Sequence, residues 1–192
     1  MQIAFKEWFI IVDALGRGEQ ILILRKGGIS EGRGGFNVDH PRFWLFPTLF
    51  HQQRESVILP AQRRFDEIAP DFPDPTTVRL NCFAEVAAWR RLDSLADAEK
   101  LRGQHIWRDE VIAGRFEWGR SKAIFALAVR VFKVEPGIVL PMRPGYGGCK
   151  SWIEIEENVP VTESKAVLDE NAFREKLQQF NQAAGVLAAK ME

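Results

Sequence analysis

Short apolar runs and periodic stretches of hydrophobic residues divide the chain into predicted strands and helices. Residues 8–15 and 19–25 form two runs rich in apolar and β-branched residues, and the sequence Gly-Arg-Gly at 16–18 separates them. Two such runs around a short glycine-containing loop are typical of a β-hairpin. We therefore expect the amino-terminal part of the chain to contain a hairpin.

Three later stretches have the pattern of strands. Apolar residues at alternate positions from 78 to 86 predict a strand with one buried face. Residues 122–134 are apolar on both alternating faces, apart from Arg130 and the lysines near the ends, which favours a central strand covered on both sides. Residues 151–156 alternate again and predict a further strand.

Helical signals are fewer and stand at three places. Ser94 is positioned to cap a short helix over 94–102 that Gly103 would end, and Pro60 suits the first turn of one or two helical turns over 60–68. The clearest helix begins at Asp169, and Gly185 weakens it near its end. Its apolar stripe comprises Phe173, Leu177, Phe180, Ala184 and Leu187.

Glycine and proline mark the segments between these elements. Residues 26–36 contain five glycines and predict a loop. Residues 42–50 are rich in aromatic side chains, but Pro47 interrupts them, which favours an edge strand or an irregular segment. Pro70, Pro73 and Pro75 predict an extended connector.

The order of these elements predicts an α+β fold. Strands and helices do not alternate regularly, so a doubly wound parallel sheet is not expected. We expect a mostly antiparallel, curved sheet or partial barrel with a few short helices and a C-terminal amphipathic helix. A single domain would span residues 1–156, and a linker at 157–168 would lead to a helix at 169–191 packed on that domain.

Composition is that of an ordinary globular protein. The chain has 192 residues, of which 46% are hydrophobic, and no run approaches the ~20 apolar residues of a membrane span. Two cysteines cannot make a disulfide framework, so we expect a reducing, cytoplasmic setting and no membrane partner.

Charge is balanced in total but uneven along the chain. Residues 1–64 hold 9 basic against 6 acidic side chains, and residues 113–152 hold 7 against 2. These two basic segments either converge on one face or separately solvate their own surfaces.

Known catalytic motifs find little support. The glycine-rich sequence at 145–151 is no P-loop, because Cys149 stands where the glycine before the lysine is required. The three histidines are isolated and no Cys-x-x-Cys is present, so we predict no metal site and no cofactor. Cys149 beside Lys150 is the one candidate nucleophile, with His51 as its base; the alternative is a cysteine packed in the core.

Aromatic and basic residues occurring together give the strongest functional signal. Four of the six tryptophans lie close in sequence to arginine, lysine or histidine. Rings stack on unstacked or flipped bases while cations hold phosphates, although tryptophan is also good core material. The candidate ligand-binding residues are Arg25, Lys26, Arg42, Trp44, His51, Gln52, Tyr146, Cys149, Lys150 and Trp152.

Five stretches of the sequence together resemble the domain-of-unknown-function family 1802 of bacterial proteins. They are Phe-Lys-Glu-Trp at 5–8, Leu-Arg-Lys-Gly-Gly-Ile at 24–29, Phe-Trp-Leu-Phe-Pro-Thr at 43–48 with His-Gln at 51–52, His-Ile-Trp at 105–107, and Tyr-Gly-Gly-Cys-Lys-Ser-Trp at 146–152. The resemblance implies no reaction and no catalytic residue. Some relatives carry a restriction-endonuclease-like domain, so it implies a role in restriction–modification and a nuclease partner.

The order of strand, short helix and strand is also similar to small barrels of the PUA, ASCH and EVE type, which bind RNA or modified bases. This similarity implies a fold and carries little weight for function.

Three hypotheses for function result. The chain is a nucleic-acid-associated binding module, a small-molecule or nucleotide enzyme that uses Cys149 and His51, or a scaffolding subunit whose C-terminal helix docks a partner. In the first, cationic and polar side chains contact phosphate or base edges and two rings stack on bases, with Arg25, Lys26, Arg42, His51 and Lys150 in the former role and Trp44 and Trp152 in the latter. That hypothesis requires residues 25–54 and 145–152 to meet in space.

Overall fold

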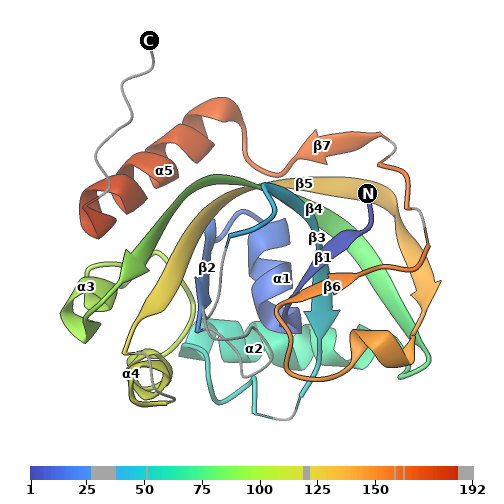
Figure 1. The fold of residues 1–192 in the computed structure, drawn as a ribbon, viewed down its shortest axis with the longest axis horizontal. Coiled ribbons are helices and arrows are strands. Elements are labelled where there is room, and N and C mark those ends of the chain that lie inside the picture. The colour runs from blue at the N-terminus through green and yellow to red at the C-terminus, as the bar shows by residue number, and fades with distance from the viewer. Residues whose placement is uncertain (27–37, 51, 119–121, 158, 162, 186–192) are drawn as a thin grey trace.

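The computed structural model describes residues 1–26, 38–50, 52–118, 122–157, 159–161 and 163–185. They form an α+β fold in which a strongly curled, mixed sheet makes a half-barrel surrounded by helices (Figure 1). The strands are β1 (Ile3–Trp8), β2 (Leu22–Arg25), β3 (Arg42–Thr48), β4 (Thr77–Leu92), β5 (Ile124–Pro141), β6 (Trp152–Glu154) and β7 (Ser164–Ala166). The helices are α1 (Phe9–Gly16), α2 (Leu59–Ile68), α3 (Leu95–Glu99), α4 (Asp109–Glu117) and α5 (Glu170–Ala184). The predicted α+β class with a curved sheet is confirmed.

The strand order along the sheet is β2-β5-β4-β3-β1-β6, with β7 paired to β5. Every pairing is antiparallel except the one between β1 and β3, which is parallel. The long strands β4 and β5 form the arch of the half-barrel, and register shifts in their pairing accompany its curvature (Figure 1). No described helix has the length and apolar character needed to cross a membrane.

The amino-terminal hairpin prediction is wrong. Residues from Phe9 onward form helix α1, which lies within the curl of the sheet, and β2 pairs with β5 instead (Figure 1). Ile10, Ile11, Ala14 and Leu15 of this helix are all fully buried on the face toward the core, while Asp13 forms ion pairs with Arg17 and Arg64. A short helix of this kind has the same uniformly apolar sequence as a buried strand, and periodicity cannot distinguish the two.

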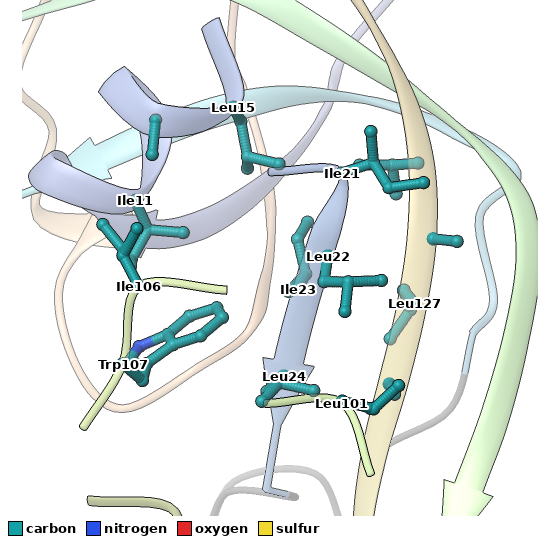
Figure 2. Packing of buried hydrophobic residues seen from close by; sticks show 14 of the residues in the cluster. Ile11, Leu15, Ile21, Leu22, Ile23, Leu24, Leu101, Ile106, Trp107 and Leu127 are labelled. Atoms are coloured by element: carbon teal, nitrogen blue, oxygen red, sulfur yellow. The ribbon is translucent and has the colours of Figure 1, made fainter. Parts of the chain in front are cut away.

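Figure 2 shows how α1 fills the interior of the half-barrel. Ile11 points toward Ile106, and Leu15 is directed toward β2. These residues belong to the main core, which lies between the sheet and the helices and also includes Trp107 and Phe180. A second, smaller core covers the other face of the sheet and contains Trp44, Phe46, Phe83 and Tyr146.

Strand β3 is internal, so the predicted edge strand or irregular segment at 42–50 is wrong. Its side chains alternate between the two cores, with Phe43 and Leu45 on one face and Trp44 and Phe46 on the other. Pro47 is tolerated because the pairing of β3 with β4 ends at Trp44, so no hydrogen bond from position 47 to β4 is lost.

The other predicted strands are confirmed at greater length for 78–86 and 122–134, and β5 is a central strand as expected. Ser94 caps α3 by accepting the N–H of Asp97 at 3.1 Å. Helix α2 runs for ten residues, longer than the one or two turns expected. Helix α4 was not predicted, and β7 lies within the stretch assigned to a linker.

Helix α5 packs along β4 and β5 on the outer side of the arch (Figure 1). Asp169 caps it by accepting the N–H of Ala172 at 2.9 Å, as expected. Phe173 and Phe180 enter the main core. Gly185 has a φ of 63° and ends the helix in the left-handed conformation, which glycine adopts at little cost. Leu187, expected in the apolar stripe, lies outside the described residues.

Candidate functional site

The end of strand β1 places two charged side chains on opposite faces of the sheet. Lys6 is the register partner of Phe46 in β3 and lies on the side of the smaller core, whereas Glu7 faces the main core. The Lys6 Nζ donates hydrogen bonds to the carbonyl oxygens of Tyr146 at 2.7 Å and Gly148 at 2.8 Å. The main-chain N–H of Lys6 donates to the carbonyl of Ser151 at 2.9 Å, so the segment 146–151 wraps around Lys6.

Arg25 joins this group from the other edge of the sheet. It is the last residue of β2, and its Nε donates to Ser151 Oγ at 2.7 Å, next to β6. Its guanidinium also lies 5.4 Å from the centre of the Phe5 ring. The curl of the sheet therefore brings edge strand β2 to the side of edge strand β6, and residues 25 and 146–151 meet as the binding hypothesis requires.

The positive charges around Lys6 act on its pKa. The pKa of Lys6 is lowered, mainly by burial and then by the positive charges of Arg25 and Lys150, while an ionised Cys149 would raise it. Lys150 and Cys149 are themselves exposed. Cations held within mutual reach repel one another, and a bound anion would relieve that repulsion. We call Lys6, Arg25 and Lys150 the cation cluster.

Glu7 lies beneath the cluster between two arginines. Its carboxylate is 2% exposed; Oε1 accepts the N–H of Trp8 at 2.7 Å, and Oε2 has no hydrogen-bond partner among the described residues. Burial raises the pKa of Glu7, although Arg25 and Arg115 act to lower it. With one carboxylate against several cations, this region carries an excess of positive charge.

Arg115 reaches the same region from α4. Its Nη1 donates to the carbonyl of Leu24 at 2.7 Å, and its guanidinium lies 5.3 Å from the Trp8 ring centre and 5.1 Å from that of Trp107. The side chain keeps some solvent exposure, but protein surrounds the guanidinium closely enough that burial lowers its pKa to about 10. The nearby charge of Arg25 contributes to that lowering, while Glu7 opposes it.

Two of the predicted ring residues are part of the protein interior. Trp44 is completely buried in the smaller core, where its indole N–H donates to the carbonyl of Met1 at 3.2 Å. It offers no free face to a base, which corrects its predicted stacking role. Tyr146 is 2% exposed, and its hydroxyl donates to Glu157 at 3.0 Å and accepts the N–H of Glu156 at 3.0 Å.

Trp152 and Lys26 lie at the margin of the cation cluster. Trp152 is half-buried and makes edge contacts with the rings of Phe5, Phe43 and His40, at centre separations of 4.8, 4.9 and 5.0 Å. Lys26 follows Arg25 directly, and burial lowers its pKa, with a further contribution from Lys122.

The remaining predicted site residues do not join the cluster. Arg42 stands four residues before Phe46 on β3, roughly 13 Å along the strand, and forms an ion pair with Glu85 at 3.2 Å. Gln52 is exposed, and its carbonyl accepts a hydrogen bond from Ser56 Oγ at 2.7 Å. His51 lies outside the described residues, and so does its predicted pairing with Cys149.

A cleft of about 680 Å³ adjoins the cluster on the side of the smaller core. Three segments line it: the end of β3 at 46–49, the proline-rich connector at 69–75, and residues 142–147 after β5. Lys6 forms part of its wall, and the floor includes Phe46 and Pro47. Its size is within the range of pockets that hold drug-sized ligands.

A family model for a domain of unknown function, DUF1802, matches residues 4–179, which is most of the chain. The chain belongs to the DUF1802 family. No curated protein matches this DUF1802 chain.

The chain is also similar to two crystal structures of ZmASCH mutants from Zymomonas mobilis. The serine-to-alanine mutant is 12% identical, with a TM-score of 0.47 over 92% of this chain and 94% of the other. The tyrosine-to-phenylalanine mutant is 13% identical, with a TM-score of 0.42 over 92% and 96%. At this identity the likeness concerns the fold and transfers no function.

Sequence reasoning missed three site residues of the DUF1802 protein: Lys6, Glu7 and Arg115. The only signal for the first two was a Lys-Glu pair placed between Phe5 and Trp8, and Arg115 lies on the helix that was not predicted. Among the described residues, no group of three or more histidine, cysteine, aspartate or glutamate side chains is arranged to hold a metal ion.

Proposed function

We propose that this DUF1802 protein binds nucleic acid or nucleotides by their phosphate groups, at the cation cluster of Lys6, Arg25 and Lys150. The observation that carries the proposal is the convergence of these cations from β1, β2 and the segment before β6. Lysine and arginine are the residues that hold phosphates, and Lys6 and Arg25 are already fixed by hydrogen bonds to the protein.

The aromatic surroundings favour a nucleic-acid ligand over a plain inorganic anion. Trp8 and Trp152 lie half-buried beside the cluster, Trp8 against the Arg115 guanidinium and Trp152 against the buried ring of Phe5. Rings next to phosphate-binding cations are typical of proteins that bind unstacked bases. The link to restriction–modification and a nuclease partner rests on the family resemblance alone. The enzyme and scaffolding alternatives rest on the sequence patterns that suggested them.

Binding of labelled single-stranded and double-stranded oligonucleotides, followed by fluorescence anisotropy, tests the proposal. We expect the affinity to fall steeply between about 50 and 200 mM salt, because phosphate contacts release counterions. Lys150→Gln should weaken binding roughly fivefold or more and reduce the salt slope by about 0.7–0.9. Lys150 is exposed, so this substitution leaves the fold intact.

Arg174→Gln is the matched control. It removes the same charge from α5, on the outer side of the arch, where Arg174 is 68% exposed and pairs with Glu170. The control should bind as the wild type does. Absence of binding by the wild type at low salt, or equal binding by Lys150→Gln and Arg174→Gln, would overturn the proposal.

A further inference from the structure

We infer that the cleft beside Lys6 receives the planar ring of a nucleobase whose phosphate lies at the cation cluster; this inference rests on the proposed function. The cleft is concave, preformed and of a size suited to a nucleotide-like ligand, at about 680 Å³. It is distinct from the cluster itself, because Lys6 is the one member of the cluster that lines it.

The walls of the cleft favour a flat ring. Half-buried Phe72 contributes an aromatic side chain, and prolines contribute rigid, flat faces from all three lining segments, while Phe46 and Tyr146 are almost completely buried and support the lining from the smaller core. Phe46 and Tyr146 hold each other at a ring-centre separation of 5.7 Å, and Phe72 is held against Phe9 at 4.9 Å. A lining fixed in this way loses little freedom when a planar ligand packs against it, which favours binding of the ligand.

Lys6 provides the charge that connects the two sites. Two of its three ammonium N–H groups are used by the carbonyls of Tyr146 and Gly148, which fix the ammonium at the cleft wall. In the described part of the chain, the third N–H has no acceptor. A phosphate bound there would also be within electrostatic reach of Arg25 and Lys150. A ring in the cleft would therefore place its attached phosphate at the cluster.

The chemistry identifies a nucleotide, and either a free nucleotide or a residue of a single strand can supply it. An aliphatic anion would satisfy Lys6 but would gain little from ring faces. A neutral aromatic compound would use the walls but leave the cations unpaired. The combination of ring and phosphate satisfies both halves of the arrangement.

Ligand-observed NMR titrations with adenosine 5′-monophosphate, adenosine and ribose 5-phosphate test the inference. A base that enters the cleft should make the nucleotide bind about five- to a hundredfold more tightly than ribose 5-phosphate. Met142→Trp, which adds a bulky side chain at a 37% exposed lining position, should abolish that difference and adenosine binding. Leu49→Trp, at a 42% exposed position on another wall, should do the same.

Val139→Trp is the matched control. Val139 is 54% exposed on β5, three residues before Met142, and does not line the cleft. The control should retain the wild-type preference for the nucleotide, and circular dichroism should show that all three variants are folded. Equal affinity of the wild type for the nucleotide and ribose 5-phosphate, or an unchanged preference in both cleft variants, would overturn the inference.

The two proposals fail in distinguishable ways. If only the cleft inference is wrong, the wild type still binds oligonucleotides and Lys150→Gln still binds them more weakly. The nucleotide and ribose 5-phosphate then bind with equal affinity. If only the cation proposal is wrong, adenosine still binds to the wild type and not to Met142→Trp. Competition between the mononucleotide and a single-stranded oligonucleotide identifies the source, since the natural ligand should displace the other at lower concentration.

Discussion

His105 gives the DUF1802 protein a pH dependence that can be worked out from the structure. The side chain is 7% exposed, and its Nδ1 has no hydrogen-bond partner among the described residues. Burial lowers its pKa to about 4, Arg115 contributes to the lowering, and Asp109 opposes it. A histidine in the unfolded chain has a pKa of about 6.5, so the unfolded state binds a proton that the folded state does not.

The buried, neutral His105 therefore costs no stability above pH 6.5. The free energy of unfolding falls as the pH drops from 6.5 towards 4. The difference of about 2.5 pKa units corresponds to about 3 kcal/mol in total, and to about 2.5 kcal/mol by pH 4.5. In His105→Gln this contribution is missing at every pH. The free energy of unfolding should consequently fall between pH 7.5 and 4.5 by about 2.5 kcal/mol more in the wild type than in the variant.

Urea unfolding followed by tryptophan fluorescence at the two pH values measures the effect. Comparing the change with pH, rather than the absolute stability, removes the cost of replacing the ring. Gln104→Ala changes a neighbouring side chain that does not titrate and should keep the wild-type dependence. An equal loss of stability in wild type and His105→Gln would refute the reasoning, as would an NMR titration that places the His105 pKa near 6.5.

Other consequences of burial can be checked in the same way. Glu7→Gln should gain stability over the wild type as the pH rises from the unfolded carboxyl pKa of about 4.3 to the folded pKa that burial has raised, and urea unfolding from pH 4 to 8 should show the gap widening over that range; a gap independent of pH contradicts it. Phe180→Ala should cost about 3–5 kcal/mol in the same assay and half-buried Leu177→Ala clearly less; equal costs would contradict the packing of α5. Under native conditions a thiol reagent should label exposed Cys149 and spare Cys82, which is 3% exposed and has a pKa raised to about 11. Labelling of both cysteines at one rate would contradict this expectation. Labelling of Cys149 faster than a free thiol would favour the enzyme alternative.

The sequence is most informative where a residue's role is local. Ser94 and Asp169 cap helices because their side chains accept nearby N–H groups, and such contacts depend only on residues three positions away. The alternation in β4 and the doubly apolar β5 are likewise visible in the sequence, because one or two faces of each strand are buried. The curved α+β fold could be predicted from these elements.

The errors arose where long-range packing decides. Residues from Phe9 onward are helical because α1 lies inside the half-barrel with one face in the core, and their composition does not differ from that of a buried strand. Pro47 sits in an internal strand because β4 leaves that strand three residues earlier. Neither the reach of a partner strand nor the surroundings of a helix is encoded in the local pattern.

The candidate site was predictable only where the residues themselves form a local sequence pattern. Lys150 was found because it stands two residues before Trp152, Cys149 because it is next to Lys150, and Arg25 because it precedes a glycine-rich loop. Trp44 was misassigned, since a ring in the core and a ring in a ligand site have the same sequence context. Lys6 and Glu7 acquire their roles only when the sheet curls and brings β2 beside β1 and β6.

The hydrogen bond from Arg25 to Ser151 connects the two edges of an open sheet. The half-barrel is therefore closed at this point by side chains rather than by strand pairing. A ligand in the cation cluster would strengthen this connection, because it would contact both edges of the sheet at once. Ligand binding at the proposed site would thereby stabilise the half-barrel, and saturation at a hundred times Kd would add about 2.7 kcal/mol to its free energy of unfolding.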